Sequence, residues 1–354
     1  MTFRPAERVR EPAIPMKPLV DPAGWQAADL AANDDWIYEL SEVEKDDIRQ
    51  AVAVVQRRGL DILQVTRENF PLPHLDAGLR AMFDELLEGR GFVLIRGMPI
   101  AEFDKTQAGI AFWGIGMRFG RALSQNAKGH LLGHVKDFGG DYADPHVRGY
   151  QTSAEMNFHS DQCDYVALLC VQPSKSGGAS RIASSVTVYN EMLKESPELV
   201  QALVDDFYLT KHGEVSPGQR PWYKMPLFSF RDGYFTARGA GAHVMKAQSL
   251  AGVPKFTDTQ RAALRAYQQI ARRVHFDMDF RPGDIQILHN HVTLHTRTAF
   301  EDWPEPERKR HLMRLWLNER AGGRPTVPGF RDQIQGIEVA GTVPCAPVDA
   351  FEPA

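Results

Sequence analysis

The chain has 354 residues, and its 41 lysines and arginines against 45 aspartates and glutamates give a formal charge of −4. This slightly acidic balance argues against nucleic-acid and polybasic membrane partners. The longest clear apolar run, 165–171, is far too short to span a bilayer. The three cysteines have no CxxC spacing, which favours reduced thiols and a cytoplasmic location. The sequence leaves the oligomeric state open, and a homo-oligomer is one of the candidates.

Residues 1–90 are predicted to form an arm and helices that pack on the core. Several prolines up to residue 22 indicate an irregular arm. Ser41 and Glu44 have the spacing of a capping box, which predicts a helix through about Arg58. Apolar residues at helical spacing predict a second helix over 75–87.

Residues 91–320 are predicted to form one catalytic domain with a mainly β core. Helices are expected at 106–119, 188–204 (interrupted near Pro197) and 257–273. Short apolar or alternating runs predict strands at 92–95, 130–135, 165–171, 180–184, 207–211, 275–280, 285–288, 294–298 and 311–318. Helices followed by many short strands indicate an α+β fold in which helices surround a β core.

Two long polar segments, 137–157 and 213–226, are predicted to be loops that line the pocket. The first leads directly into the candidate site described next, and loops of that length beside a site are often lids. Residues 321–354 are predicted to be a C-terminal tail. The sequence has no internal repeat and no convincing linker.

Two short segments far apart in the chain carry the candidate metal ligands. In an extended strand, residues i and i+2 point the same way, so His159 and Asp161 could bind one ion from a single face. His295 could supply a third ligand from a neighbouring strand. Two imidazoles and one carboxylate leave coordination positions open, as in non-haem Fe(II) oxygenases.

Other interpretations of these residues remain open at this point. The tripeptide at 159–161 is weak alone, because a buried histidine beside a solvated aspartate is common. His289 and His291 compete with His295 as ligands, but the Asn290–His291 pair indicates a turn, which favours His295. Cys163 shares the strand parity of the ligands, yet its soft thiolate suits packing better than an oxygen-activating site.

An arginine-bearing strand near the end of the chain predicts an anion site. Alternation places Arg310 and Arg314 on one face together with Leu312 and Trp316. Burial of two arginines is costly without anions, and a guanidinium matches a carboxylate bidentately. We therefore expect a dicarboxylic cosubstrate or an acidic substrate. Ser180, which follows the Gly-Gly turn, could donate its hydroxyl to the same carboxylate, whereas taken alone it is interpreted as a turn residue.

Other basic residues carry less information. Arg297, together with Arg314, is a weak indication of an anionic small molecule. Lys128, Lys136 and Arg148 are interpreted as ordinary surface charges.

Taken together in their order, these motifs resemble the Fe(II)/2-oxoglutarate-dependent dioxygenases of the taurine dioxygenase (TauD/TfdA-like) family. The resemblance covers roughly residues 92–318. It rests on five elements: Phe158-His159-Ser160-Asp161, Ser176-Gly177-Gly178, Pro282-Gly283-Asp284 with Asn290, Leu294-His295-Thr296-Arg297, and the arginine-bearing strand at 310–316.

The resemblance implies a double-stranded β-helix (jelly-roll) core and Fe(II) held by His159, Asp161 and His295. It also implies that the distal carboxylate of 2-oxoglutarate meets Arg310 and Ser180, with Arg314 available to the substrate or the cosubstrate. The family's usual Gly-Gly-Asp-Thr reads Gly-Gly-Ala-Ser at 177–180, which keeps the hydroxyl and loses a methyl group. An insertion at 302–307 lengthens the spacing from His295 to Arg310.

The implied activity is hydroxylation of a small, anionic organic molecule, with consumption of O₂ and 2-oxoglutarate and release of succinate and CO₂. Two alternatives stay open: a zinc-dependent hydrolase that uses the same three ligands, and a jelly-roll binding protein without catalysis. The hydrolase lacks an evident general base and leaves the paired arginines unexplained. The sequence does not identify the primary substrate, nor does it separate hydroxylation from desaturation.

Overall fold

The computed structural model describes residues 3–140, 147–319 and 323–349. Its main sheet has the strand order β1-β2-β13-β5-β16-β3, with β4 also paired to β16. Only β1 and β2 run parallel among these pairs of described strands. The strands are β1 (Ile37–Glu39), β2 (Phe92–Arg96), β3 (Arg121–Ala122), β4 (Leu132–Val135), β5 (Tyr165–Gln172), β13 (Ile285–His289) and β16 (His311–Asn318).

A smaller antiparallel sheet faces the main sheet. It has the order β12-β7-β14, with β7 (Ser180–Ser184) between β12 (Phe276–Met278) and β14 (Thr293–Arg297). Alternate side chains of both sheets pack into one buried cluster. This cluster includes Phe92, Leu94, Val166, Ile182, Met278, Leu288 and Trp316.

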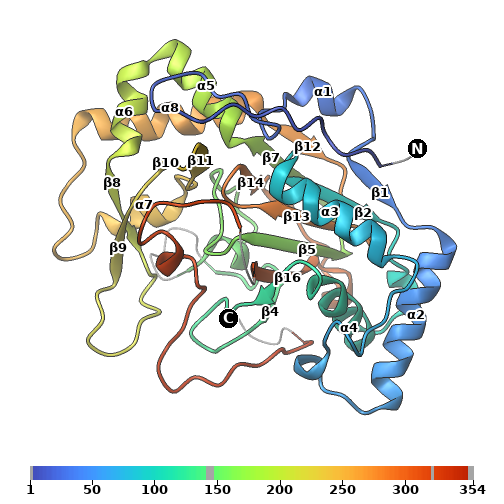
Figure 1. Cartoon of the computed structure of the whole chain (residues 1–354). Helices are drawn as coiled ribbons and strands as arrows, with labels where there is room; N and C mark the ends of the chain where they lie inside the picture. The colour runs from blue at the N-terminus through green and yellow to red at the C-terminus, as the bar shows by residue number, and fades with distance from the viewer. Residues whose placement is uncertain (1–2, 141–146, 320–322, 350–354) are drawn as a thin grey trace.

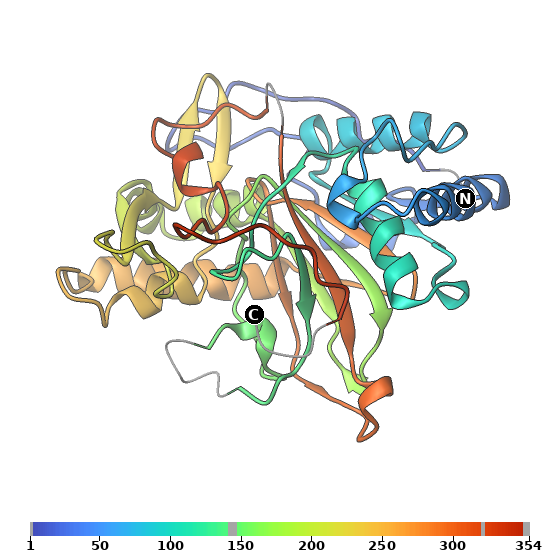
Figure 2. The same cartoon turned by 90° about the horizontal axis from the view of Figure 1, so that it is seen from below.

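Two groups of helices cover the outer faces of the sheets (Figures 1 and 2). The first group lies against the main sheet, and the second lies against β7 and the region of residues 206–237. The first consists of α2 (Glu42–Arg57), α3 (Asp76–Glu88) and α4 (Lys105–Gly116), and the second of α5 (Ser185–Glu195), α6 (Pro197–Val204) and α8 (Asp258–Val274).

The predicted capping box of α2 is confirmed. The hydroxyl of Ser41 accepts a hydrogen bond from the Glu44 amide, and the Glu44 carboxylate accepts one from the Ser41 amide. The residues 1–90 also contribute to the main sheet, because Ile37 of β1 lies opposite Leu94 of β2. No helix among the described residues is both long and apolar enough to cross a bilayer.

The remaining elements include some that the sequence pattern did not reveal. The prediction of a loop over 213–226 is wrong at its C-terminal end. Residues 222–226 form a strand that pairs with the strand at 206–210. The hairpin β10–β11 and helix α7 were also not predicted, although Asp232-Gly233 is a hairpin turn signal. These elements are α1 (Ala27–Ala31), β6 (Ser176–Gly177), β8 (Asp206–Thr210), β9 (Trp222–Pro226), β10 (Phe228–Arg231), β11 (Tyr234–Ala237), α7 (Ala242–Ala247) and β15 (Phe300–Glu301).

Part of the predicted lid at 137–157, namely residues 141–146, lies outside the described residues. In the predicted C-terminal tail, residues 321–322 and 350–354 do so as well. The described part of the tail returns to the main sheet, where the Pro347 carbonyl accepts a hydrogen bond of 2.8 Å from Nε2 of His134.

The His134 side chain joins this tail to β16, since its Nδ1 lies 2.8 Å from Nε2 of His311. Burial lowers the pKa of both histidines, that of His311 to about 3. In the unfolded chain both bind a proton below about pH 6.5. The free energy of unfolding should therefore fall as the pH drops below 6.5, and His311 contributes up to about 1.4 kcal/mol per pH unit down to about pH 3.

This pH dependence is measurable by urea denaturation at pH 7 and pH 5. We expect His311→Gln to lose less stability over this interval than the unaltered protein. Equal losses in the two proteins would contradict the assignment.

Candidate metal centre

The structure brings His159, Asp161 and His295 together. One ligand atom from each lies within 4.8 Å of the others. Among the described residues, these three form the cluster of histidine and acidic side chains that could hold a metal ion. His295 is the third residue of β14, and it forms an isolated antiparallel bridge with His159. Their backbone hydrogen bonds measure 3.0 and 2.9 Å, and their rings lie 4.3 Å apart.

The prediction that one strand carries both His159 and Asp161 is wrong. Only His159 pairs with a neighbouring strand, and the chain leaves regular structure at Ser160 and Asp161. Side chains therefore have to hold this segment. One of them is Asn290, whose Oδ1 accepts a hydrogen bond of 3.0 Å from the Asp161 amide.

The protonation states of the three side chains suit a metal ion. Nδ1 of His159 donates to the Asn157 carbonyl at 2.9 Å, which leaves the lone pair on Nε2. Burial lowers the pKa of His159 and also that of His295, the latter to about 3, so both rings are neutral at pH 7. Burial alone would raise the pKa of Asp161, but the Arg314 guanidinium beside it lowers the pKa to about 2.

Two atoms of this group lack a hydrogen-bond partner among the described residues, Nδ1 of His295 and Oδ2 of Asp161, and a metal would supply a partner to the second. Oδ2 of Asp161 is buried and has no hydrogen-bond partner among the described residues. It lies 3.6 Å from Nε2 of the neutral His295. Two imidazole nitrogens and one carboxylate oxygen form a donor set that fits Fe(II).

The predicted cosubstrate residues line the same pocket as the three candidate ligands. The Arg310 side chain is only 4% exposed, and its Nη1 has no hydrogen-bond partner in the part of the chain that the structure describes. Burial lowers the pKa of Arg310 to about 10. Its guanidinium lies 5.2 Å from the Phe300 ring, which flanks the charge on one side.

Ser180 lies at the start of β7 and also lines the pocket. Its hydroxyl accepts a hydrogen bond of 3.0 Å from Nε2 of Gln286, a fully buried residue of β13. The same hydroxyl donates a longer hydrogen bond of 3.4 Å to Oε1 of Gln286, which an acceptor in the pocket could replace. Sequence reasoning missed Gln286, because a glutamine within an apolar strand has no distinctive pattern.

Arg314 lies on the other side of Asp161, with Nη1 3.7 Å from Oδ1 of that carboxylate. Its Nε donates to Oε1 of Gln125 at 2.7 Å. Its guanidinium lies 4.7 Å from the Tyr150 ring and 5.0 Å from the Trp316 ring. These contacts fix the side chain within the pocket.

The interpretation of Arg148 as a surface charge is wrong. The residue is 8% exposed, lines the pocket and lies near the same two aromatic rings as Arg314. Its Nη1 donates to the Gln125 carbonyl at 2.6 Å and to Glu214 at 3.2 Å. These partners lie far along the chain, so no local pattern reveals the burial of Arg148.

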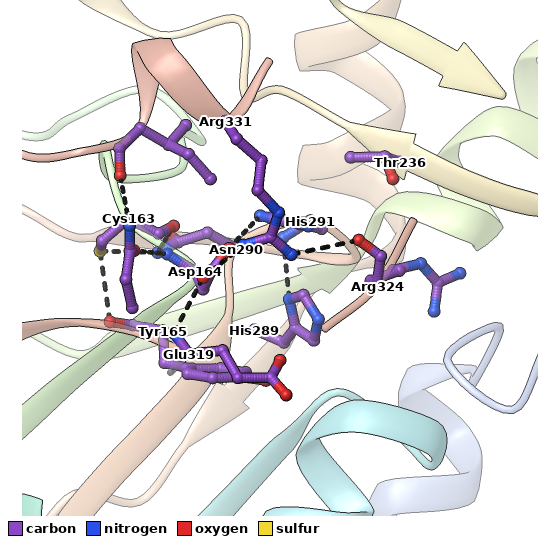
Figure 3. Close-up of polar contacts among 12 residues, drawn as sticks. Cys163, Asp164, Tyr165, Thr236, His289, Asn290, His291, Glu319, Arg324 and Arg331 are labelled. Carbon is purple, nitrogen blue, oxygen red and sulfur yellow. Dashed lines mark hydrogen bonds and ion pairs between the residues drawn. The ribbon is translucent and has the colours of Figure 1, made fainter. Parts of the chain in front are cut away.

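The competing candidates lie elsewhere. Nε2 of His291 is 3.1 Å from Oδ1 of Asp164, whose carboxylate also pairs with Arg331 (Figure 3). The His289 ring lies against that of His291, with the ring centres 4.6 Å apart and the ring planes tilted by 59°. Cys163 is fully buried and accepts from Asn290 at 3.2 Å, in agreement with a packing role.

Comparison with known proteins gives related enzymes. The family described as "Taurine catabolism dioxygenase TauD, TfdA family" matches residues 57–316. FR-33289 synthase of Streptomyces rubellomurinus is 29% identical over 315 residues, which are 86% of this chain and 92% of that protein. A uridine-5'-phosphate dioxygenase of a Streptomyces species is 28% identical over 164 residues, 45% of this chain and 57% of that enzyme.

A solved structure of asparagine oxygenase, in complex with Fe(II), hydroxyasparagine and succinate, has a similar fold. Its TM-score is 0.64 at 17% sequence identity, and the match covers 80% of this chain and 93% of that one. The family match spans well over half of the chain and includes all three candidate ligands. The chain therefore belongs to the TauD, TfdA family, and the prediction of a 2-oxoglutarate-dependent dioxygenase is confirmed.

Proposed function

We propose that His159, Asp161 and His295 hold Fe(II), and that the enzyme hydroxylates a small anionic molecule with 2-oxoglutarate as cosubstrate. In this proposal Arg310 and Ser180 bind the distal carboxylate of 2-oxoglutarate. Arg314 faces the primary substrate. The bound metal, with 2-oxoglutarate and O₂, supplies the oxidising chemistry, and succinate and CO₂ are released.

The observation that carries the proposal is the buried Arg310 guanidinium in the same pocket as the metal group. A buried charge without a partner is strongly unfavourable, and a carboxylate would pair with it through charge-assisted hydrogen bonds. The Ser180 hydroxyl lies on a strand facing β16 and can donate to the same carboxylate. Both residues would orient 2-oxoglutarate so that its keto acid end reaches the metal group.

The substrate side of the pocket is rich in positive charge. It is lined by Arg148, Arg314 and Lys246. Among the described residues that line the pocket, Asp161 is the acidic one. This charge distribution favours an anionic substrate. The name of the uridine-5'-phosphate dioxygenase denotes an anionic substrate for that relative, which supports the same class here.

The chain's own residues also control water and geometry. Tyr150 and Trp316 flank the two arginines, so the anion would bind between aromatic walls and away from bulk solvent. Exclusion of water strengthens each charge-assisted hydrogen bond in the site. The substrate's C–H bond would then be held on the metal-facing side of these arginines.

We also propose the finer architecture that the sequence implied. The facing sheets, with the site between β14 and the segment around His159, support a double-stranded β-helix core. In this proposal the chain consists of three parts: an arm with helices at 1–90, the dioxygenase domain at 91–320 and a tail at 321–354. The cytoplasmic location and the oligomeric state stay predictions.

A substrate screen that measures succinate tests the proposed activity. Succinate formation should require both Fe(II) and 2-oxoglutarate and should be stimulated by anionic candidates such as sulfonates, phosphates and amino acids. A zinc hydrolase or a non-catalytic binding protein would release no succinate. Metal-dependent hydrolysis without 2-oxoglutarate would favour the hydrolase.

With a substrate from this screen, Arg314→Met should raise its KM roughly tenfold, the cost of one hydrogen bond to a charged group. The KM for 2-oxoglutarate should change less than about threefold, because Arg310 binds that molecule. Steady-state kinetics with each component varied in turn measures both constants. A selective rise in the KM for 2-oxoglutarate would place Arg314 on the cosubstrate instead.

A further inference from the structure

The segment that carries two of the candidate ligands has few sheet hydrogen bonds. His159 pairs with His295, but Ser160 and Asp161 lie outside any strand. The Ser160 side chain instead bonds to the turn that follows β11. Its Oγ accepts a hydrogen bond of 2.8 Å from Nη1 of Arg238 and one of 2.9 Å from the Gly239 amide.

Arg238 reaches the backbone of the segment as well as its side chain. The same Nη1 lies 2.9 Å from the Ser160 carbonyl oxygen and 2.5 Å from that of Asp161. Nη2 lies 3.4 Å from the Tyr223 hydroxyl. Arg238 is 2% exposed, and no ion pair joins it to a carboxylate within the described ranges.

The side-chain hydrogen bonds of Arg238 are concentrated on one segment of the chain. A buried guanidinium without a carboxylate is costly, and here its polar partners are concentrated on Ser160 and Asp161. Arg238 therefore directs most of its hydrogen bonds to the part of the segment that the sheet leaves unpaired.

Two glycines bring the Arg238 turn into direct contact with the segment. A Cβ at Gly239 would lie 2.3 Å from the Ser160 nitrogen, and one at Gly241 would lie 2.7 Å from Cβ of His159. Contacts this short leave no room for a side chain. The turn at 238–241 is thus built to pack against the ligand-bearing backbone.

A third element joins the turn to the segment. Nε2 of Gln268, in α8, donates to the Phe158 carbonyl at 2.8 Å and to the Ala240 carbonyl at 2.9 Å. Oε1 of the same side chain accepts from the Phe158 amide at 3.0 Å. The turn, the helix and the ligand-bearing segment therefore form one hydrogen-bonded unit.

We propose that Arg238 is a positioning residue that holds His159 and Asp161 at the separation needed to bind the metal. The inference rests on the metal site proposed above. Arg238 does not line the pocket and acts through Ser160 and the two carbonyl groups. Its removal should let the Asp161 carboxylate drift relative to His159 and His295, and metal affinity should fall.

The test is a titration of the intact protein with Co(II), a redox-stable probe, by calorimetry and visible absorption. Arg238→Met should raise the Kd for Co(II) roughly 10–100-fold, the usual effect of losing a residue that orients a ligand. Ser160→Ala should raise it several-fold. The double variant should show less than the product of the two separate changes, because the residues act through one contact.

Arg324→Met is the matched control. Arg324 is also buried, at 3% exposure, but it pairs with Asp21 at 2.8 Å. Its replacement should lower the midpoint of thermal unfolding and leave the Kd for Co(II) within twofold. An equal loss of Co(II) affinity in this control would overturn the inference, since the effect would then be global.

The outcomes separate the inference from the metal site itself. If the unaltered protein does not bind Co(II), or if His159→Ala binds it equally well, the proposed metal site fails. If these behave as expected and a folded Arg238→Met keeps the original Kd, only the positioning role fails. Should Arg238→Met not fold, an unchanged Kd in Ser160→Ala would likewise overturn the positioning role.

Discussion

Asp161→Ala is expected to weaken Fe(II) binding and to slow succinate formation, each by more than about 100-fold. Residues that merely orient a ligand typically cost 10–100-fold in metal affinity, and Asp161 is proposed to be a ligand itself. Its carboxylate is ionised, buried and unpartnered at Oδ2 among the described residues. Fe(II) affinity under anaerobic conditions and succinate production with 2-oxoglutarate measure the two losses.

Asp164→Asn provides the matched control for this variant. Asp164 is a buried carboxylate three positions along the chain, and it pairs with His291 and Arg331 rather than with the metal group. Its replacement should reduce stability and leave Fe(II) affinity nearly unchanged. If both variants lost Fe(II) binding to the same degree, the loss would reflect disruption of the fold, and Asp161 would not be assigned as a ligand.

Arg310→Met is expected to raise the KM for 2-oxoglutarate by about 30-fold or more. Truncation of one partner of a buried charge pair costs 2–5 kcal/mol, and each 1.4 kcal/mol is tenfold. The methionine side chain keeps most of the apolar volume beside Phe300, so the protein should remain folded. Initial rates with varied 2-oxoglutarate, and direct binding of 2-oxoglutarate to the metal-loaded protein, measure the effect.

The Arg310 variant has an internal control in Ser180→Ala. Loss of a single neutral hydrogen bond costs about 1 kcal/mol, so Ser180→Ala should raise the same KM only several-fold. The ranking, with Arg310 well above Ser180, follows from the burial of the guanidinium. A variant at Arg310 with the original KM would mean that 2-oxoglutarate does not pair with this arginine.

Much of the core was predictable from local pattern. The predictions for β7 and β16 match the structure at both ends, and those for β5 and β13 end one residue early. Of these, β5 and β13 are largely apolar runs beside turn signals, and such runs are constrained by burial on both faces. The grouping of His159, Asp161 and His295 was also predicted, because ligand types at a fixed spacing carry information even without structure.

Other features depend on contacts between residues far apart in the sequence. Arg148 is buried by Gln125, Glu214 and Trp316, and none of these is its neighbour in the chain. Arg238 likewise meets Ser160 and Asp161 across 78 and 77 positions. Arginines usually lie at the surface, so sequence alone favours exposure until the tertiary partners are known.

The ligand-bearing segment illustrates the same limit. Alternation correctly predicted that His159 and Asp161 face one side, but it also predicted a strand that does not form. The side chains are placed by Asn290 and Arg238, which follow β13 and β11. Backbone pairing at this site is replaced by side-chain hydrogen bonds, and these have no periodic signature.

An anaerobic titration with Fe(II) in the presence of 2-oxoglutarate tests the central claim most directly. Chelation of Fe(II) by a 2-keto acid produces a visible charge-transfer band, which reports metal and cosubstrate together. We expect saturation at one Fe(II) per chain, with the band absent in His159→Ala and shifted to much higher 2-oxoglutarate concentration in Arg310→Met. An unchanged band in His159→Ala would contradict the metal centre and, with it, the proposed oxygenase mechanism.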